Sequence, residues 1–485
     1  MEKFKLNLRN KVVLRRASST LAIVVAISYV LAVYAAFTTN LVPGKYLGAL
    51  YLVSFLATAA LVYGLVSKRV SKRVSKRSGY KLRVLLLVVA LVGTVLNLYV
   101  YSVGMATSSF LNSTQQAGQS YEEYAIVALK DNNISLNIPN QPTGILKSEP
   151  DIALVQAGAT KHTKASFQQF DDPTSMVLSL QNNNVNMVIL KTSYVRTLQE
   201  LNNNQLYLSL QILATFKVAT TTTEGTVTGD VSRPFAIYIS GIDTYGDVSK
   251  TSRSDVNILA VVNPKTHRIL LVNTPRDYYV QLHGTTGVKD KLTHAGLYGI
   301  DQSVATLEDL YGIDIKYNIR INFSSLVKLV DTLGGVDVDS EHNFSADGYT
   351  FTQGVNTLDG KSALAFSRNR YAFEGGDRTR GENQMQVIKA IISKISSPAT
   401  ILKYQQILGD LQGTFQTNMS TESLTELIRN QIDSLAKWNV SSSSVDGTGT
   451  SDYTYSMGRQ KLYVMIPDQT SLNSAKNSIQ STLGQ

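Results

Sequence analysis

Charged side chains stand at the ends of strand-like segments in one part of the sequence. The apolar segment Phe235–Asp243 ends in Asp243, and Arg253 and Asp255 directly precede the next such segment. Arg276 stands at the end of the third. Because α/β sheets assemble their binding sites at strand ends, we expect these charged residues to belong to one site.

A second group of charged residues follows about 90 residues later. Arg368 and Arg370 are two residues apart and would project to one side of an extended segment. Arg380 and Gln384 are four residues apart and would lie on one face of a helix. The planar guanidinium group makes bidentate hydrogen bonds to phosphate, so this group predicts a site for a multiply charged oxyanion.

The aspartates near these arginines suit a hard cation. Mg²⁺ takes one or two carboxylates from a protein and completes its shell with phosphate oxygens and water. Aspartates combined with many arginines therefore indicate a pyrophosphate group rather than a simple carboxylate as the ligand.

Each of these features has a simpler structural interpretation when it is taken alone. An Arg-x-Arg pair is usually solvated or ion-paired, and Asp243 could form a turn or cap a helix. His294 is interpreted as a structural histidine rather than a catalytic one. The combination of arginines and aspartates in one region favours the functional interpretation.

The elements that would position these residues alternate between strands and helices. Two β-rich runs, Val256–Val262 and Ile269–Thr274, are joined by a hairpin signal at 263–268. Further strands are expected at Tyr317–Ile321 and Gly335–Val338, and helices at Ser303–Leu310, Phe323–Leu333 and 381–396. This alternation predicts a mixed-sheet α/β/α sandwich.

A separate α/β region precedes the sandwich. Tyr121–Lys217 is rich in Asn and Gln and contains no catalytic constellation. Its expected elements are strands at Tyr124–Leu129 and Val185–Leu190 and a helix at Tyr194–Leu201. The polar segments Thr107–Ser120 and Thr220–Gly229 are interpreted as linkers. We therefore expect an accessory domain with its linkers at 106–229, the main domain at 230–400, and a C-terminal part packed on the main domain at 401–485.

Three apolar runs lie near the N-terminus, at Ala17–Phe37, Tyr46–Val66 and Val84–Val103. Each has about 20 residues, the length that a helix needs to cross about 30 Å of hydrocarbon. A cleaved signal peptide is the alternative for the first run. Two further runs of full length follow it, which favours three transmembrane helices within 17–105.

The positive charge of the chain is confined to its membrane-proximal part. The net charge is +10, yet residues 104–485 contain 31 Lys and Arg against 35 Asp and Glu. This distribution argues against a nucleic-acid-binding body. The chain has no cysteine, which excludes disulfides, thiolate metal sites and cysteine nucleophiles.

The basic segments predict the orientation of the chain in a membrane. Residues 1–16 contain six Lys and Arg, and the loop 67–83 contains eight Lys and Arg and no acid. Both are expected in the cytoplasm, because basic loops remain on that side. The third span would then place the C-terminal domains outside. The loop could alternatively bind a nucleic acid or a regulatory partner, but contact with anionic lipid is favoured.

These residues, in this order, resemble the LytR–CpsA–Psr family of wall-glycopolymer transferases. The resemblance covers about Arg233–Ser396. It rests on the motifs Gly241-Ile-Asp243, Ser252-Arg-Ser-Asp255, Thr274-Pro-Arg276-Asp, Lys291-Leu-Thr-His294-Ala and Gly334-Gly-Val-Asp337, and on the cluster of Arg368, Arg370, Asp377, Arg380 and Gln384. The three spans and the region 121–217 resemble the capsule-associated branch, in which an accessory domain precedes the transferase domain.

The resemblance implies a domain that binds a polyprenyl pyrophosphate, with the lipid tail in an apolar pocket. Asp243 and Asp255 would place Mg²⁺, for which Mn²⁺ could substitute. The implied pyrophosphate-binding residues are Arg253, Arg276, Arg368, Arg370, Arg380 and Gln384. Asp255 or Arg276 would act as the catalytic base, and the sequence leaves this choice open.

The implied activity is a phosphotransfer that attaches an undecaprenyl-pyrophosphate-linked glycopolymer, expected to be capsular polysaccharide, to peptidoglycan. Polyprenyl phosphate would be released. The implied location is the bacterial cell membrane, where the three spans would hold the enzyme near its lipid substrate. Two alternatives are a hydrolase of the same lipid and a non-catalytic lipid-binding regulator that acts with a capsule polymerase or kinase. No nucleic acid is expected as a partner.

Overall fold

The computed structural model describes most of the 485 residues. The residues outside this description are 1, 40–43, 68–76, 116–120, 131–133, 137–139, 148, 150, 200–208, 220–225, 243–247, 249–251, 370–376, 398–399, 401–406, 408–409, 412, 459–460 and 485. The chain forms two compact units. The first contains 1–112, 398–412 and 421–435, and the second contains 113–397, 413–420 and 436–485.

The first unit contains three long helices, as predicted. They are α1 (Glu2–Thr39), α2 (Gly44–Val66) and α4 (Arg77–Gln115), and α16 (Thr421–Ser434) belongs to the same unit. The segments long and apolar enough to cross a membrane are Arg16–Thr39, Gly48–Val66 and Val84–Ser109. Most of their side chains face outward, as a lipid-facing surface requires.

The three helices meet through small and polar residues. Ala22, Val25, Leu65 and Ala90 form a buried cluster. A Cβ atom added at Gly104 would lie 2.6 Å from the Cβ of Ala35, so glycine permits this close approach of α1 and α4. The Asn97 amide also donates to the Ser28 hydroxyl at 3.2 Å across the same pair of helices. The three helices thus pack directly on one another.

The linker predicted from Thr107 begins later than expected. Helix α4 continues through the polar residues to Gln115. The Thr107 hydroxyl donates to the Val103 carbonyl at 2.9 Å, so this polar side chain bonds within the helix. A loss of hydrophobicity marks where the apolar span ends, but the helix itself extends further.

The accessory domain is an α/β sheet of five strands in the order β3-β2-β4-β1-β5. Its strands are β1 (Tyr121–Leu129), β2 (Gln141–Leu146), β3 (Ala165–Phe170), β4 (Met187–Lys191) and β5 (Leu210–Ala219). Its helices are α5 (Ile152–Ala159), α6 (Pro173–Gln181) and α7 (Thr192–Gln199). Strand β1 pairs antiparallel with both β4 and β5, whereas β2 is parallel to β3 and β4.

The sheet of the accessory domain buries side chains on both faces. One face packs Ile126, Ile145 and Ile189 against α5. The other packs Val127 and Val188 against α6 and α7, in a cluster that also contains Leu297, Met457 and Leu462. The second cluster therefore continues into residues that follow the accessory domain in sequence.

A small group of buried ionisable residues lies at the end of this sheet. The Lys191 ammonium lies 3.4 Å from the Glu122 carboxylate, with about a tenth of each side chain exposed. The Tyr124 hydroxyl donates to the buried Glu149 carboxylate at 2.6 Å. Burial raises the pKa of Glu149 above its ordinary value, although Lys191 and the Tyr124 hydrogen bond oppose the shift. Lys191 thus offsets two buried carboxylates.

Replacing Lys191 with Met is expected to destabilise the accessory domain by about 3–5 kcal/mol, because it leaves buried charge without compensation. The loss should be smaller at acid pH. A carboxyl whose folded pKa is raised stabilises the fold below its unfolded pKa and loses that contribution as pH rises through the folded pKa. Thermal unfolding of the full chain across a pH series measures this effect.

The exposed pair Lys147–Asp171, 2.9 Å apart, provides the control. Lys147→Met should cost less than about 1 kcal/mol at any pH in the series. If Lys191→Met cost no more than Lys147→Met, the buried pair would contribute nothing to stability.

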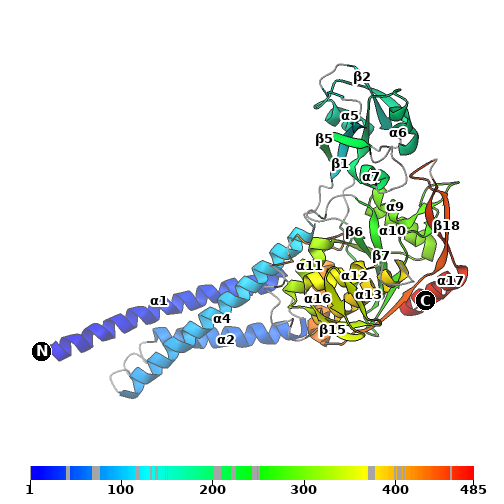
Figure 1. The fold of residues 1–485 in the computed structure, drawn as a ribbon. Coiled ribbons are helices and arrows are strands. Elements are labelled where there is room, and N and C mark those ends of the chain that lie inside the picture. Colours follow the sequence, from blue (N-terminus) through cyan, green and yellow to red (C-terminus); the bar gives the residue numbers. More distant parts are fainter. Residues whose placement is uncertain are drawn as a thin grey trace. The chain divides into compact units, whose positions relative to one another are not determined.

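The main domain is built on a six-stranded mixed sheet in the order β16-β11-β6-β7-β8-β17. Figure 1 labels β6 and β7 of this sheet. The strands are β6 (Phe235–Ile242), β7 (Ser254–Asn263), β8 (Arg268–Asn273), β11 (Tyr317–Asn322), β16 (Gln416–Thr417) and β17 (Asn439–Ser444). Strands β6, β7 and β8 pair antiparallel, as the hairpin signal predicted, while β11 and β17 run parallel to β6 and β8.

Helices cover both faces of this sheet, which confirms the predicted sandwich. The helices are α9 (Leu292–Ala295), α10 (Ile300–Tyr311), α11 (Phe323–Thr332), α12 (Gly360–Arg368), α13 (Asp377–Ile395) and α17 (Gln469–Leu483), with the short 3-10 helix η2 (Gly296–Tyr298). Tyr238 and Leu259 pack with α10 and α17 on one face. Helix α13 contacts β8 and β17, and also α12.

Four short ribbons complete the main domain. They are β9 (Tyr279–Val280) with β10 (Asp290–Lys291), β12 (Val336–Ser340) with β15 (Gly354–Leu358), β13 (Phe344–Ala346) with β14 (Tyr349–Phe351), and β18 (Gly447–Tyr453) with β19 (Lys461–Pro467). All four are antiparallel. The described residues of 436–485 therefore contribute one sheet strand, one hairpin and the helix α17.

The register brings several strand ends together at one edge of the sheet. Ile242 at the end of β6 pairs with Ser254 at the start of β7 and with Asn322 at the end of β11. Asn273 at the end of β8 pairs with Ile258, only four residues into β7. The charged residues that follow or precede these ends are thereby gathered at the same edge.

Candidate active site

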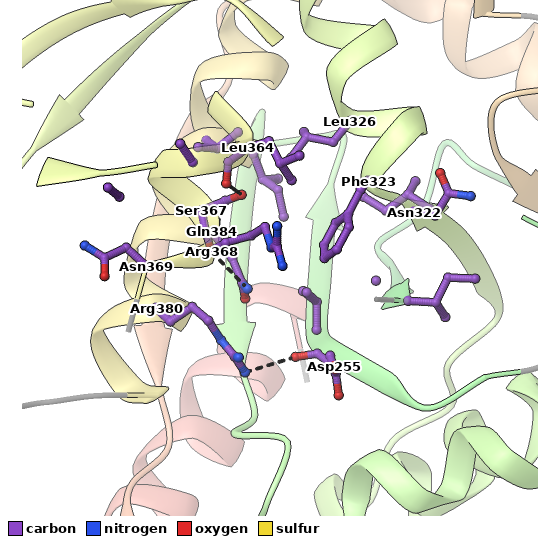
Figure 2. Close-up of a pocket in the computed structure, with 18 of the residues that line it drawn as sticks. Asp255, Asn322, Phe323, Leu326, Leu364, Ser367, Arg368, Asn369, Arg380 and Gln384 are labelled. Carbon is purple, nitrogen blue, oxygen red and sulfur yellow. Dashed lines mark hydrogen bonds between the residues drawn. The ribbon is translucent and has the colours of Figure 1, made fainter. Parts of the chain in front are cut away.

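A pocket of about 940 Å³ opens at this edge of the main sheet. Strands β6, β7 and β11 contribute their ends, and helices α12 and α13 form the opposite wall (Figure 2). The pocket is lined by four arginines, Arg253, Arg276, Arg368 and Arg380, and by two aspartates, Asp255 and Asp347. The lining therefore carries an excess of positive charge.

Asp255 is the most tightly held acid of the pocket. Its Oδ1 lies 3.3 Å from Nη1 of Arg276 and accepts a hydrogen bond of 3.1 Å from the Thr293 hydroxyl. Only 10% of its side chain is exposed. Burial alone would raise the pKa of Asp255, but the charges of Arg276, Arg253 and Arg380 and the Thr293 hydrogen bond outweigh it, so the pKa is lowered. The carboxylate is thus ionised at neutral pH.

Helix α13 brings a second set of polar groups to the pocket. Nη2 of Arg380 lies 3.5 Å from the backbone carbonyl of Asp255, as Figure 2 shows. One turn later, the Gln384 amide donates to the Ser367 carbonyl at 3.3 Å. Both residues line the pocket from one face of the helix. This placement agrees with the spacing of four that was noted in the sequence.

Arg368 reaches the pocket from the last residue of helix α12. Its guanidinium carbon lies 4.3 Å above the centre of the Phe323 ring, a cation–π contact that Figure 2 shows across the pocket. The sequence placed Arg368 and Arg370 on one side only for the case of an extended segment, and Arg368 lies in a helix instead. The N-cap Asp359, whose carboxylate accepts from Ser362 N at 2.8 Å, starts a helix that ends on Arg368.

Apolar side chains line another part of the same pocket. They include Phe323, Leu326, Leu364, Val387 and Ile388. These residues come from α11, α12 and α13, whereas Arg253, Asp255 and Arg276 come from the strand ends. The pocket is therefore amphiphilic, and its lining suits a ligand with an anionic head and an apolar tail.

A model of the LytR_cpsA_psr family matches residues 205–481. This chain belongs to the LytR–CpsA–Psr family. The polyisoprenyl-teichoic acid–peptidoglycan teichoic acid transferase TagU of Enterococcus faecalis is 36% identical over 219 residues, which are 44% of this chain and 71% of that protein. TagU of Bacillus subtilis is 35% identical over 219 residues, covering 45% and 70%.

Solved structures of the family are also similar to this chain. A crystal structure of TagV from B. subtilis is 30% identical, with a TM-score of 0.43. The match covers 52% of this chain and 98% of that structure. Most of the matched residues belong to the second compact unit, as do all the residues that line the pocket.

The LytR–CpsA–Psr pocket brings together six of the eight predicted site residues: Arg253, Asp255, Arg276, Arg368, Arg380 and Gln384. Asp243 and Arg370 lie outside the described residues. His294 is buried and pairs with Asp290 at 2.6 Å, and it does not line the pocket, which supports its structural interpretation. The roles of the predicted residues in binding and catalysis stay predictions.

Sequence reasoning missed several residues that shape the site. Asn322 and Phe323 line the pocket from the junction of β11 and α11, where a capping box joins Asn322 and Ser325. An Asn at the start of a helical pattern is a recognisable cap signal. Thr293 was noted only as part of a motif, because its contact with Asp255 spans 38 positions in sequence.

The acidic residues of the pocket set limits on a metal site. Among the residues that the structure describes, no group of three or more His, Cys, Asp or Glu is placed to hold a metal ion. Asp255 is an ionised carboxylate beside an arginine-rich pocket. This arrangement fits a cation that takes one or two protein carboxylates and most of its ligands from phosphate and water.

Proposed function

We propose that this protein is a phosphotransferase that moves a glycopolymer from a polyprenyl-pyrophosphate carrier to peptidoglycan and releases polyprenyl phosphate. One observation carries the proposal: four arginines and an apolar wall line a single pocket. A polyprenyl pyrophosphate is a ligand that needs both. The names of the TagU relatives, which describe transfer of teichoic acid to peptidoglycan, support the same class of reaction.

The arginines are proposed to bind the pyrophosphate and to neutralise charge during the reaction. Arg253 and Arg276 would approach it from the strand ends, and Arg368 and Arg380 from the helical wall. Arg370 would join them, although it lies outside the described residues. Phosphoryl transfer depends mainly on positioning and on electrostatic stabilisation of the phosphate oxygens, which is what a rigid set of guanidinium groups supplies.

In the proposed reaction, a sugar hydroxyl of peptidoglycan attacks the sugar-side phosphorus of the pyrophosphate. A new P–O bond forms to the acceptor, and the bond to the bridging oxygen breaks. The bridging oxygen leaves with the polyprenyl phosphate, and the hydroxyl proton passes to a base or to solvent. No oxidant or further co-reactant is needed.

Asp255 is the better candidate for the base of the two residues predicted. Arg276 has a guanidinium group, which stays protonated and is suited to stabilising charge. The lowered pKa makes Asp255 a weak proton acceptor, so it would accept the proton late, after the leaving group has begun to depart. Its ionised state also suits the second predicted role, that of a metal ligand.

Mg²⁺, or Mn²⁺ in its place, is the proposed cation, and Asp255 with Asp243 would hold it. When bound, such a cation neutralises charge on the phosphate oxygens. The fit rests on Asp255, since Asp243 lies outside the described residues. Asp255 would keep the orientation that Arg276 and Thr293 impose on it.

The membrane anchor is part of the proposal. The three apolar helices would hold the domain at a bilayer that contains the lipid donor. The basic segments 1–16 and 67–83 support a cytoplasmic N-terminus and an extracytoplasmic catalytic domain. The polymer is proposed to be a capsular polysaccharide because the accessory domain resembles the capsule-associated branch, whereas the names of the relatives specify teichoic acid.

A reconstituted assay tests the function. The full chain in lipid vesicles is given an undecaprenyl-pyrophosphate-linked oligosaccharide, Mg²⁺ and peptidoglycan. We expect labelled sugar to become linked to peptidoglycan in step with release of polyprenyl phosphate, and to require both the acceptor and the cation. Release of labelled oligosaccharide into solution without an acceptor would instead identify a hydrolase. Binding of the donor without turnover would favour a regulator.

A further inference from the structure

A short segment, Asp290–Leu297, contacts two charged residues of the pocket, Asp255 and Arg276. The segment contains β10, α9 and the first residues of η2. None of its residues is among the described residues that line the pocket. Its backbone nevertheless pairs with the residues after β8: Thr293 N donates to Arg276 O at 2.8 Å, and Leu292 N donates to Tyr278 O at 2.9 Å.

Thr293 orients the carboxylate of Asp255 by a hydrogen bond. Its hydroxyl donates to Asp255 Oδ1 at 3.1 Å, and the same oxygen lies 3.3 Å from Nη1 of Arg276. Thr293 is only 3% exposed, so its hydroxyl is held in one position. Two contacts from different elements thus converge on one oxygen and fix the plane in which the carboxylate lies.

Lys291 is linked to Arg276 through a second aspartate, Asp277. The Lys291 ammonium donates to Asp277 Oδ1 at 2.8 Å, and Asp277 Oδ2 lies 3.7 Å from Nε of Arg276. Arg276 therefore lies between two carboxylates, those of Asp255 and Asp277. Without Lys291 this group of three residues would carry a net negative charge, and two of the three, Asp255 and Arg276, line the pocket proposed to bind an anionic substrate.

The segment itself is firmly anchored. Asp290 is fully buried and accepts hydrogen bonds from the backbone N–H groups of Lys291 and Ser456, both at 2.8 Å, and from the Ser456 hydroxyl. The buried His294 pairs with it through Nδ1 at 2.6 Å. At the other end, Lys191 of the accessory domain donates to the Leu297 carbonyl at 3.4 Å. Thr293 and Lys291 therefore stand on a rigid support.

We propose that Thr293 and Lys291 are positioning residues for the transfer reaction. Thr293 fixes the Asp255 carboxylate, and Lys291, through Asp277, keeps Arg276 oriented and its positive charge available to the pyrophosphate. The proposal rests on the proposed function. Preorganised charge is the main source of catalysis in phosphoryl transfer, so a small loss of orientation lowers the rate.

The first test removes the Thr293 hydroxyl at nearly constant volume. In the reconstituted assay, Thr293→Val is expected to lower kcat about tenfold, as loss of one hydrogen bond to a charged group would, while KM for the lipid donor changes little. Thr293→Ser keeps the hydroxyl and should retain most of kcat. Thr197→Val is the matched control, because Thr197 is similarly buried, its hydroxyl donates to the Ser193 carbonyl at 2.8 Å within α7, and it does not line the pocket.

The second test concerns charge. Lys291→Met should raise KM for the anionic donor several-fold, because Asp277 is then uncompensated. The double variant Lys291→Met with Asp277→Asn removes the excess negative charge and should recover most of the lost affinity. A purely structural role of Lys291 would not be repaired by removing a second polar contact.

Arg276→Ala is measured alongside to separate the possible failures. Full activity of Arg276→Ala would refute the proposed function of the pocket. If Arg276→Ala is inactive while Thr293→Val and Lys291→Met behave as the wild type, only the positioning proposal is overturned. The positioning proposal is also overturned if Thr293→Val folds poorly and Thr293→Ser loses as much kcat as Thr293→Val does. It is likewise overturned if the double variant Lys291→Met with Asp277→Asn does not recover the KM for the donor.

Discussion

Replacing Arg276 with Ala is expected to lower the kcat of glycopolymer transfer by about 10²–10³-fold, the usual cost of removing one preorganised group that stabilises transition-state charge. Arg276 forms an ion pair with the Asp255 carboxylate, at 3.3 Å, and it also approaches Asp277. Its loss removes the positive charge between two carboxylates. The reconstituted assay, with kcat and KM measured separately, gives the size of the effect.

The same variant has a consequence in cells. If attachment fails after the polymer has been made, the polymer should be shed into the medium while the protein stays abundant. Arg233→Ala serves as the control, because Arg233 forms an exposed pair with Asp230 at 2.9 Å and does not line the pocket. Unchanged wall attachment in the Arg276→Ala strain would assign the arginine–aspartate site a structural role and favour the regulator hypothesis.

Asp255 and the arginines around it stabilise one another electrostatically. The pKa of Asp255 is lowered because Arg276, Arg253 and Arg380 outweigh the cost of burial. Such a carboxyl stabilises the fold at pH above its unfolded pKa and loses that contribution as pH falls through the folded pKa. When no substrate is bound, the Asp255 carboxylate in turn offsets part of the positive charge of these arginines. The acid and the bases of this pocket therefore support each other in the empty site.

Several elements of the fold could be predicted because their signals are local. The hairpin of β7 and β8 follows from two β-rich runs joined by an Asn-Pro turn, and α13 follows from helical spacing. Arg380 and Gln384 were placed on one helical face from their separation alone. The convergence of β6, β7 and β8 at one edge follows from strand direction, so the core of the site was predictable.

Other features depend on contacts that no local pattern records. Strand β17 is a serine-rich segment with low β propensity, and it forms because it pairs in parallel with β8, about 170 residues earlier. The link from Lys291 through Asp277 to Arg276 is likewise a tertiary arrangement. Helix α12 did carry a local signal, the N-cap at Asp359, although no helix was predicted there.

A change of one glycine should be nearly as damaging as the loss of Arg276. Gly296 lies against the start of β7: a Cβ atom added there would be 2.7 Å from both Ser252 O and Ser254 N. Both contacts are with backbone atoms, which cannot move aside as a flexible side chain would. Gly296→Ala must therefore shift either the segment that carries Thr293 or the strand start that carries Arg253 and Asp255.

Either shift separates groups that the site holds together. A misplacement of about 1 Å can cost about 10² in rate, so Gly296→Ala is expected to lower kcat by roughly that factor. Overpacking should also destabilise the main domain by about 1–3 kcal/mol. Gly93→Ala is the matched control, since an added Cβ there meets no atom within 4 Å. Wild-type kcat and thermal stability in Gly296→Ala would mean that the segment Asp290–Leu297 is not packed rigidly against β7. The proposal that this segment holds Thr293 and Lys291 in place would then fail as well.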